Sequence, residues 1–338
     1  MQRRLIDYLI ISLKGMAMGA ADAVPGVSGG TIAFISGIYE ELINTISGIN
    51  MSLLATLRKD GFFGFWKQLN GNFILALLSG IIISFVSFMR LAKYLLENHP
   101  ILIWSFFFGL IIASIYFVGK QITKWHLATF VGIIIGAVVA YYITTIPASS
   151  VNESSYFLFF AGALAICAMI LPGISGSFIL VILGAYKTLS DAIHDIDFKK
   201  LALFVGGAIV GLLSFSHVLK WLFKTYHNLT LALLTGFIIG SLNKVWPWKK
   251  TITVMIDGTG EIVPFSNISE FTTLSVHQLQ TNDFESYKTV LEKSISPLHY
   301  SELNKYVVQD QLMFAVFLMI IGFLTIFLLE KLGSKANK

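Results

Sequence analysis

The sequence predicts an all-α polytopic membrane protein made of two inverted-topology repeats. Each repeat is expected to be a re-entrant helix hairpin plus three transmembrane helices, and one small polar extracytoplasmic insert is expected in the second. Three observations predict this fold class: a very apolar composition, a Pro-Gly-x-Ser-Gly break that occurs twice inside apolar segments, and an uneven distribution of basic residues among the loops. Together they indicate helices in a membrane rather than a water-soluble core.

The composition excludes an ordinary soluble domain. Of the 338 residues, 55% are hydrophobic and 13% are charged, whereas soluble domains carry about 25% charged residues. The segment Thr251–Asp310 holds eight acids and three lysines, so the rest of the chain is strongly basic. No basic and aromatic cluster stands outside the apolar segments, and we therefore expect no nucleic-acid partner. The single cysteine, Cys167, excludes an internal disulfide.

The apolar segments set the expected boundaries, because a transmembrane helix needs roughly 20 apolar residues. The first repeat, residues 1–150, is expected to contain a re-entrant hairpin at 5–49 and spans at about 72–96, 101–118 and 127–146. The second repeat, residues 151–338, is expected to contain a re-entrant hairpin at 155–193, spans at about 200–224, 229–246 and 312–330, and the polar insert at 251–310. The segment Ser52–Gly71 is either an interfacial helix or a plain loop. The insert is either a small β-rich unit or partly disordered.

The two breaks belong to an internal repeat. An offset of 147 gives nine identities, without a gap, in the eighteen positions from Pro25 to Leu42. The matched residues of the first repeat are Pro25, Gly26, Ser28, Gly29, Ile32, Ile35, Gly37, Tyr39 and Leu42. An offset of 127 then pairs Gly80, Phe88, Lys93 and Gly109 with Gly207, Phe215, Lys220 and Gly236. Matches of Pro, Gly, Ser and Tyr are not expected from apolar composition alone.

An odd number of spans per repeat places the second repeat upside down relative to the first. With the N-terminus inside, the following basic residues lie on the cytoplasmic side: Arg3, Arg4, Arg58, Lys59, Lys67, Lys120, Lys124, Lys331, Lys335 and Lys338. The loop Pro147–Ser155 has no Lys or Arg and lies outside, as does the acidic insert. Four lysines do not fit this arrangement: Lys199, Lys200, Lys249 and Lys250. We expect both termini on the cytoplasmic side of the membrane, in an architecture typical of secondary transporters.

The two breaks predict an anion site. Proline stops a helix and glycine permits a sharp reversal, so the helix-breaking residues are Pro25, Gly26, Pro172 and Gly173. The half-helix that follows each break begins with free N–H groups inside the membrane, which suits an anion and above all phosphate. The expected phosphate-binding residues at the breaks are Ser28, Gly29, Gly30, Thr31, Ser175, Gly176 and Ser177. The alternative is a plain helix-breaking hairpin whose amides are satisfied.

Charged residues inside the apolar segments are further candidates. Asp22 directly precedes the first break and is expected to accept a proton or a cation; otherwise it is a helix cap or a partner for Lys14. Glu40 follows the first half-helix and either titrates or reaches the interface. Arg90 and His217 are equivalent in the repeat and are expected to bind phosphate, although cationic residues at span ends also snorkel to the interface.

Several chemistries have no support in the sequence. There is no Walker A motif, no His/Cys cluster with metal-binding spacing and no GxSxG nucleophile elbow. Ser28 and Ser175 have no histidine nearby in the sequence, so nucleophilic catalysis is unsupported. We therefore expect no metal and no cofactor.

The two break regions resemble a known family. The stretches GMAMGAADAVPGVSGGTIAFISGIYEELI and LPGISGSFILVILGAYKTL are similar to PopT-type polyprenyl-phosphate transporters, formerly a bacterial membrane domain of unknown function. The resemblance covers nearly the whole chain and implies return of undecaprenyl phosphate from the outer to the inner leaflet. The family's motif residues correspond to Asp22, Pro25, Gly26, Ser28, Gly29, Gly30, Thr31, Tyr39, Glu40, Pro172, Gly173, Ser175, Gly176 and Tyr186. The polar insert has no place in the family pattern.

The expected function is translocation of undecaprenyl phosphate across the cytoplasmic membrane for carrier recycling in cell-envelope synthesis. Ion-coupled alternating access is expected, with H⁺ or Na⁺ as the coupling ion and the lipid and bilayer as partners; the oligomeric state is left open. A competing function is that of a polyprenyl-pyrophosphate phosphatase, whose signature is similar to PGxSRS, but Gly29 and Gly176 stand here at the arginine position. A transporter of a small soluble anion and a scaffold that acts through the insert also remain open.

Overall fold

The computed structural model describes residues 3–22, 28–147, 149, 152, 154–304 and 311–336. Most of these residues are helical, and one small sheet precedes the last helices. The helices are α1 (Leu5–Asp22), α2 (Gly29–Ile35), α3 (Tyr39–Ser47), α4 (Met51–Gln68), α5 (Gly71–Asn98), α6 (Pro100–Lys120), α7 (Leu127–Thr145), α8 (Ser155–Ile170), α9 (Gly176–Ile182), α10 (Tyr186–His194), α11 (Phe198–Val245), α12 (Leu274–Thr281), α13 (Pro297–Leu303) and α14 (Leu312–Ala336). The strands are β1 (Lys249–Ile256), β2 (Ile262–Pro264) and β3 (Tyr287–Ser294), with a short 3₁₀ helix η1 (Phe265–Asn267) after β2.

The helices are those of a polytopic membrane protein. Among the described residues, α5, α6, α7 and α11 are each long and apolar enough to cross a membrane. The pair α9 and α10, bent by 110° at its break, gives a fifth candidate when taken together. The apolar parts of α8 and α14 are shorter. The six spans that the sequence predicts each correspond to helix: 200–224 and 229–246 form the two arms of α11, on either side of Tyr226, and α14 contains 312–330.

Helix α11 joins the segments 200–224 and 229–246, which the sequence predicts as separate spans. Its backbone leaves helical geometry at Tyr226 (φ −130°, ψ 47°). The residues around this point contain no proline or glycine that would end a helix. Two helical arms therefore meet at Tyr226, which lies between the two predicted spans, and the chain turns there without a helix-ending residue. The arm before Tyr226 packs on α8 through Gly207, and the arm after it packs on α7 through Gly236.

Two helix pairs pack through glycines at matching positions. In the pair α1 and α5, Gly15 faces the carbonyl oxygen of Leu77, and Gly80 faces that of Ser12. In the pair α8 and α11, Gly162 faces the carbonyl oxygen of Phe204, and Gly207 faces that of Phe159. A side chain at any of these glycines would collide with the facing backbone, so each pair depends on small residues for its close approach. The offsets of 147 and 127 that align the two halves of the sequence also relate these contacts.

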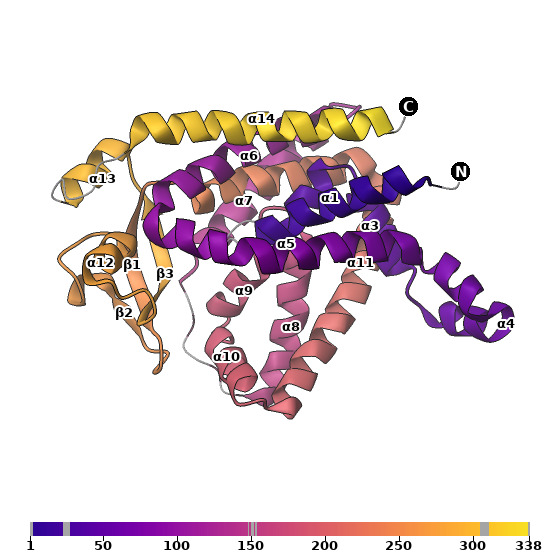
Figure 1. Ribbon diagram of the computed structural model, residues 1–338, viewed down its shortest axis with the longest axis horizontal. Coiled ribbons are helices and arrows are strands. Elements are labelled where there is room, and N and C mark those ends of the chain that lie inside the picture. The colour runs from indigo at the N-terminus through magenta and orange to yellow at the C-terminus, as the bar shows by residue number, and fades with distance from the viewer. Residues whose placement is uncertain are drawn as a thin grey trace.

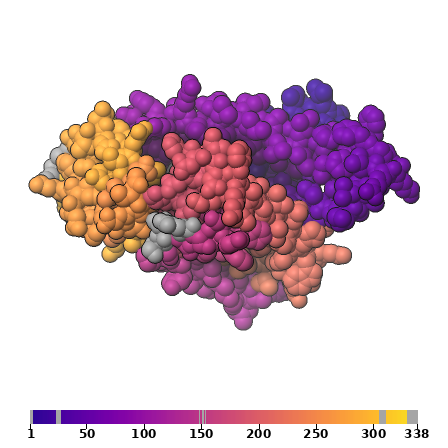
Figure 2. Space-filling model, turned by 90° about the horizontal axis from the view of Figure 1, so that it is seen from below, coloured from indigo at the N-terminus to yellow at the C-terminus, as the bar shows by residue number. Residues whose placement is uncertain are grey.

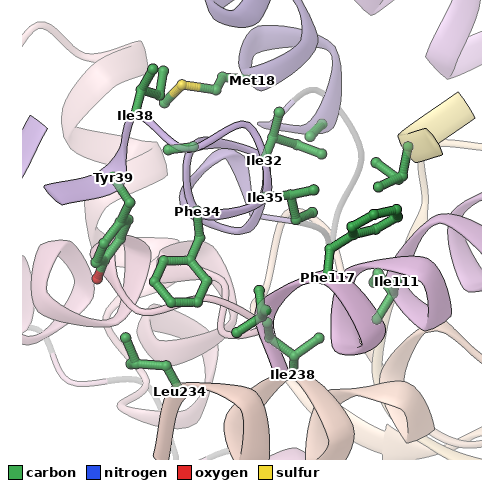
Figure 3. Packing of buried hydrophobic residues seen from close by; sticks show 14 of the residues in the cluster. Met18, Ile32, Phe34, Ile35, Ile38, Tyr39, Ile111, Phe117, Leu234 and Ile238 are labelled. Atoms are coloured by element: carbon green, nitrogen blue, oxygen red, sulfur yellow. The ribbon is translucent and has the colours of Figure 1, made fainter. Parts of the chain in front are cut away.

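Helix α2 lies at the centre of the main hydrophobic core. Nearly all of its residues are buried. The rings of Phe34 and Tyr39 meet edge to face with centroids 4.9 Å apart, and both pack against Phe223 of α11. Figure 3 shows side chains around α2 directed toward Ile238 of α11 on one side and Phe117 of α6 on another. Packing on several sides thus fixes the first half-helix in place.

The segment between the first hairpin and α5 is helical. Asn50 caps α4, because its side chain accepts a hydrogen bond from the Ser52 N–H at 2.8 Å. The expectation of a plain loop is therefore wrong. Helix α4 projects from one end of the molecule (Figure 1), where Phe63 is 88% exposed. Exposed aromatic rings beside lysines are typical of a helix at a membrane interface.

The insert folds as an antiparallel sheet in the order β2-β1-β3 with two short helices. It is therefore β-rich in its described part. Val254, Phe265 and Leu274 form its core. Trp248 and Tyr300 belong to a second cluster that joins the insert to α6 and α14. Figure 1 shows the insert at one end of the long axis and both chain termini at the other.

Candidate functional site

The first break leaves α2 with a satisfied N-terminus. Ser28 is the N-cap residue, and its side-chain oxygen accepts a hydrogen bond from the Gly30 N–H at 3.1 Å. The Asp22 carboxylate at the end of α1 accepts one from the Gly29 N–H at 2.6 Å. The Thr31 N–H donates to the Ser28 carbonyl. The expectation of free N–H groups at this break is therefore wrong, because Asp22 and Ser28 supply the acceptors. Pro25 and Gly26 lie outside the described residues.

The second break is built differently. Gly173 follows Pro172 with φ +87°, a conformation that favours glycine. Ser175 is the N-cap residue of α9 but makes no side-chain capping bond; its hydroxyl lies 2.8 Å from that of Ser177. Among the described residues, no acceptor is bonded to the N–H groups of Gly176 and Ser177. Polar groups at this break therefore remain available.

The two breaks touch each other. The Gly173 N–H donates a hydrogen bond to the Thr31 hydroxyl at 2.9 Å. The Ser28 hydroxyl donates to the Met169 carbonyl at 3.1 Å, and the Tyr39 hydroxyl donates to the Ile170 carbonyl at 3.1 Å. These two carbonyls stand at the C-terminal end of α8, where a helix leaves its acceptors free. The first hairpin thus supplies hydrogen-bond donors to the last carbonyls of α8, the helix that precedes the second break.

Burial distinguishes the two half-helices. Helix α2 is buried along nearly its whole length, whereas only Gly176 and Leu180 are buried in α9. Ser28 is 2% exposed, and Ser177 is exposed. The repeated sequence therefore occupies two unlike environments. The first copy is part of the core, and the second faces open space.

A cavity of about 370 Å³ lies between the two breaks; we call it the break cavity. Its polar lining consists of Asp22 and the serines of the two breaks, Ser28, Ser175 and Ser177. The rest of the lining is apolar and comes from α5, α8, α9 and α11, with Phe85, Met169 and Phe204 among the larger side chains. The cavity therefore has a small polar region in an apolar wall. This arrangement suits a ligand with a compact polar head and a hydrocarbon tail.

Lys14 and Glu40 lie away from the break cavity. The Lys14 ammonium donates to the Ser36 carbonyl at the end of α2 at 2.7 Å, so Lys14 is not the partner of Asp22. Glu40 lies at the start of α3, and its carboxylate is 3.1 Å from His227 of α11. His227 directly follows the bend of α11 at Tyr226. Glu40 therefore connects the first hairpin to the bend.

Arg90 and His217 are not brought to the breaks. Both are exposed, Arg90 on α5 and His217 on α11, and neither lines the break cavity. The His217 ring nitrogen lies 2.7 Å from the Leu213 carbonyl of its own helix. Their positions agree with side chains that reach the membrane surface.

Three lysines outside the expected phosphate-binding set gather beneath the insert. Lys244, Lys249 and Lys288 line a second cavity of about 390 Å³, which we call the insert cavity. A signal for them exists in the sequence, because Lys249 is one of the lysines that do not fit the loop charge rule. No group of three His, Cys, Asp or Glu side chains that could hold a metal ion occurs within the described part of the chain.

Comparisons with known proteins agree with the resemblance. Residues 18–263 match a family described as undecaprenyl phosphate translocase-like. A polyprenyl-phosphate transporter of Vibrio cholerae is 45% identical over 273 residues, which cover 80% of this chain and 89% of the relative. A polyprenyl-phosphate transporter of Staphylococcus aureus is 35% identical over 264 residues, which cover 72% of this chain and 88% of the relative. No solved structure matches.

Proposed function

This chain belongs to the undecaprenyl phosphate translocase-like family, and we propose that it moves undecaprenyl phosphate between the leaflets of the bacterial cytoplasmic membrane. The movement would return the lipid carrier from the outer leaflet for reuse in cell-envelope synthesis. Two relatives that are named polyprenyl-phosphate transporters support the substrate class. The chemistry of the break cavity supports the same class.

The lining of the break cavity is the observation that carries the proposal. Three serine hydroxyls and one carboxylate meet at the breaks, and the remaining wall is apolar. A phosphate monoester needs hydrogen-bond donors, and Ser175 and Ser177 supply them where α9 begins. The polyprenyl chain needs a lipid-like path, which Phe85, Met169 and Phe204 provide. A cavity for a soluble anion would not need that apolar wall.

The membrane topology is part of the proposal. We assign residues 1–150 and 151–338 to two inverted repeats, with both termini cytoplasmic and the insert extracytoplasmic. The matching glycine contacts of α1 with α5 and of α8 with α11 support a repeat. The position of the insert at the end opposite to both termini supports the sidedness (Figure 1).

Alternating access would use the difference between the two half-helices. The core holds α2 on all sides, so we assign the movement to α9 and the arm of α11 before Tyr226, which pack around the break cavity. Asp22 lines this cavity and is the proposed proton acceptor. Glu40 contacts His227 beside the bend of α11 and would transmit the protonation state to that bend. The coupling ion is H⁺ or Na⁺.

The test is a reconstituted assay with full-length protein in vesicles that contain a polyprenyl phosphate. Added alkaline phosphatase removes the phosphate of lipid in the outer leaflet only, so transport converts a partial reaction into a complete one. We expect complete reaction with protein, faster under a pH gradient, and partial reaction in empty vesicles. A reaction that stays partial with protein would contradict lipid transport. Release of phosphate from polyprenyl pyrophosphate without added phosphatase would favour the membrane enzyme instead.

A further inference from the structure

The insert cavity lies between the insert and the membrane helices. Its membrane side is formed by Trp104 of α6, Phe178 of α9 and Lys244 of α11. Its other side is formed by β1 and β3, which contribute Lys249 and Lys288. Figure 2 shows the insert, in orange to yellow, packed beside the second hairpin and the neighbouring helices. The cavity is therefore completed by the insert, a part of the chain to which the sequence assigned no role.

The insert cavity carries more positive than negative charge. Lys249 pairs with Glu292 at 3.3 Å, and its ammonium also donates to the Lys244 carbonyl at 2.7 Å. Lys288 pairs with Asp257 at 2.6 Å. Burial by itself would raise the pKa of Glu292, but the nearby ammonium groups of Lys249 and Lys244 hold it below its ordinary value. Glu292 is thus ionised, and one of the three lysine charges remains after these pairs are counted.

That remaining charge is Lys244. Among the described residues, its ammonium has no carboxylate or carbonyl partner, and its contact is the Phe178 ring, whose centroid lies 4.5 Å away. Phe178 belongs to the first turn of α9, next to Ser177. Glu292 acts on Lys244 only at longer range and pairs with Lys249, and an ammonium against an apolar wall with no carboxylate of its own is costly. A partner anion from outside the chain would relieve that cost.

We propose that the insert cavity binds the phosphate monoester head group of the lipid on the insert's side of the membrane, before the head group reaches the break cavity. The inference rests on the proposed function for the identity of the lipid. Ser177 lines both cavities, so the start of α9 connects them. Phosphate monoesters carry close to two negative charges, which match the ammonium of Lys244 beside two further lysines. Leu96, Ile101 and Val181 give the same cavity an apolar wall for the first isoprene units.

The test compares Lys244→Met with Lys250→Met, a control in the adjoining strand whose side chain does not line the insert cavity. Full-length protein in nanodiscs is titrated with a fluorescent polyprenyl phosphate, and inorganic phosphate is added in a separate titration. We expect Lys244→Met to bind the lipid about tenfold to a hundredfold more weakly, as loss of a charge-assisted contact implies, with Lys244→Arg restoring most of the affinity. Lys250→Met should bind like the unaltered protein.

A stability measurement separates binding from folding. Removal of this half-buried charge, which has no carboxylate of its own, should leave the thermal midpoint of Lys244→Met unchanged or higher, while its binding falls. Equal lipid binding by Lys244→Met and Lys250→Met, with transport intact, would overturn the role of the insert cavity and leave the proposed function standing. Binding of inorganic phosphate that depends on Lys244, with no binding of the lipid, would overturn the lipid assignment itself.

Discussion

The Gly173 N–H donates a hydrogen bond to the Thr31 hydroxyl at 2.9 Å, across 142 residues of sequence. This bond joins the two breaks directly, because Thr31 lies in the first turn of α2 and Gly173 lies in the turn that precedes α9. Thr31 is 1% exposed, so water cannot replace it as the acceptor. The two breaks therefore form one structural unit, and we expect a substitution at one break to alter the structure of the other.

Thr31→Val keeps the shape of the side chain and removes the acceptor for Gly173. The N–H of half-buried Gly173 then lacks this partner, which should lower the free energy of unfolding by about 1–3 kcal/mol. The measurement is thermal or denaturant unfolding in detergent, and Thr31→Ser, which retains the hydroxyl, is the matched control. Equal loss in both variants would show that the methyl group rather than the hydrogen bond matters.

Gly30→Ala tests the contact between α2 and the end of α8. A Cβ at Gly30 would stand 2.8 Å from the Ile170 carbonyl oxygen and 2.9 Å from that of Met169. The backbone must move to admit it, and overpacking of this kind costs about 1–3 kcal/mol. Gly119→Ala in α6 is the control, since nothing lies within 4 Å of a Cβ there and alanine favours a helix. A fall in the unfolding midpoint for Gly119→Ala but not for Gly30→Ala would contradict this account.

Ser28→Ala and Ser175→Ala should differ in kind. Ser28 accepts from Gly30 and donates to Met169 while buried, so its loss should lower the free energy of unfolding by about 1–3 kcal/mol. The hydroxyl of Ser175 contacts only that of Ser177 within the described chain, so its loss should change stability by less than about 0.5 kcal/mol. Under the proposed function, Ser175→Ala should nevertheless abolish transport. Full transport by Ser175→Ala would remove it from the head-group site.

Asp22→Asn separates the structural role of Asp22 from its charge. The amide oxygen can still accept the Gly29 N–H, so the thermal midpoint should stay close to that of the unaltered protein. If Asp22 is the proton acceptor, transport should be lost or become independent of the pH gradient. Asp22→Ala removes the acceptor as well and should also lower the thermal midpoint. Transport by Asp22→Asn that still responds to the gradient would exclude this residue as the coupling group.

The ion pair of Glu292 should make the stability of the insert depend on pH. Its pKa in the folded protein is lowered from 4.5, so its ion pair contributes stability above about pH 4.5, and this contribution is lost as the pH falls through the lowered value. Thermal unfolding of the full-length protein, followed between about pH 3 and 6, should show the loss below about pH 4.5. Glu292→Gln should remove this part of the pH dependence. An identical pH profile in the variant would mean that other carboxylates cause it.

The local sequence was sufficient for most spans and for the breaks. Apolar runs of membrane length, and Pro-Gly pairs within them, are properties of short stretches, so the helices from α5 to α7 begin and end within a few residues of the expected positions. The break in α11 at Tyr226 also falls between two predicted spans, but no local residue marks it. Nothing in the residues around Tyr226 stops a helix, and only packing on α8 and then on α7 bends α11 there.

The sequence by itself determined that this apolar chain carries two copies of one break. It thereby determined where the two half-helices begin. The tertiary structure decided what each copy does. Asp22 and Ser28 satisfy the first copy and the core encloses it, whereas the second copy opens onto two cavities. Lys244, Lys249 and Lys288 meet beneath the insert only because β1 and β3 fold back over α9 and α11. Such contacts depend on how distant segments pack, and two copies of one motif in different surroundings therefore acquire different chemistry.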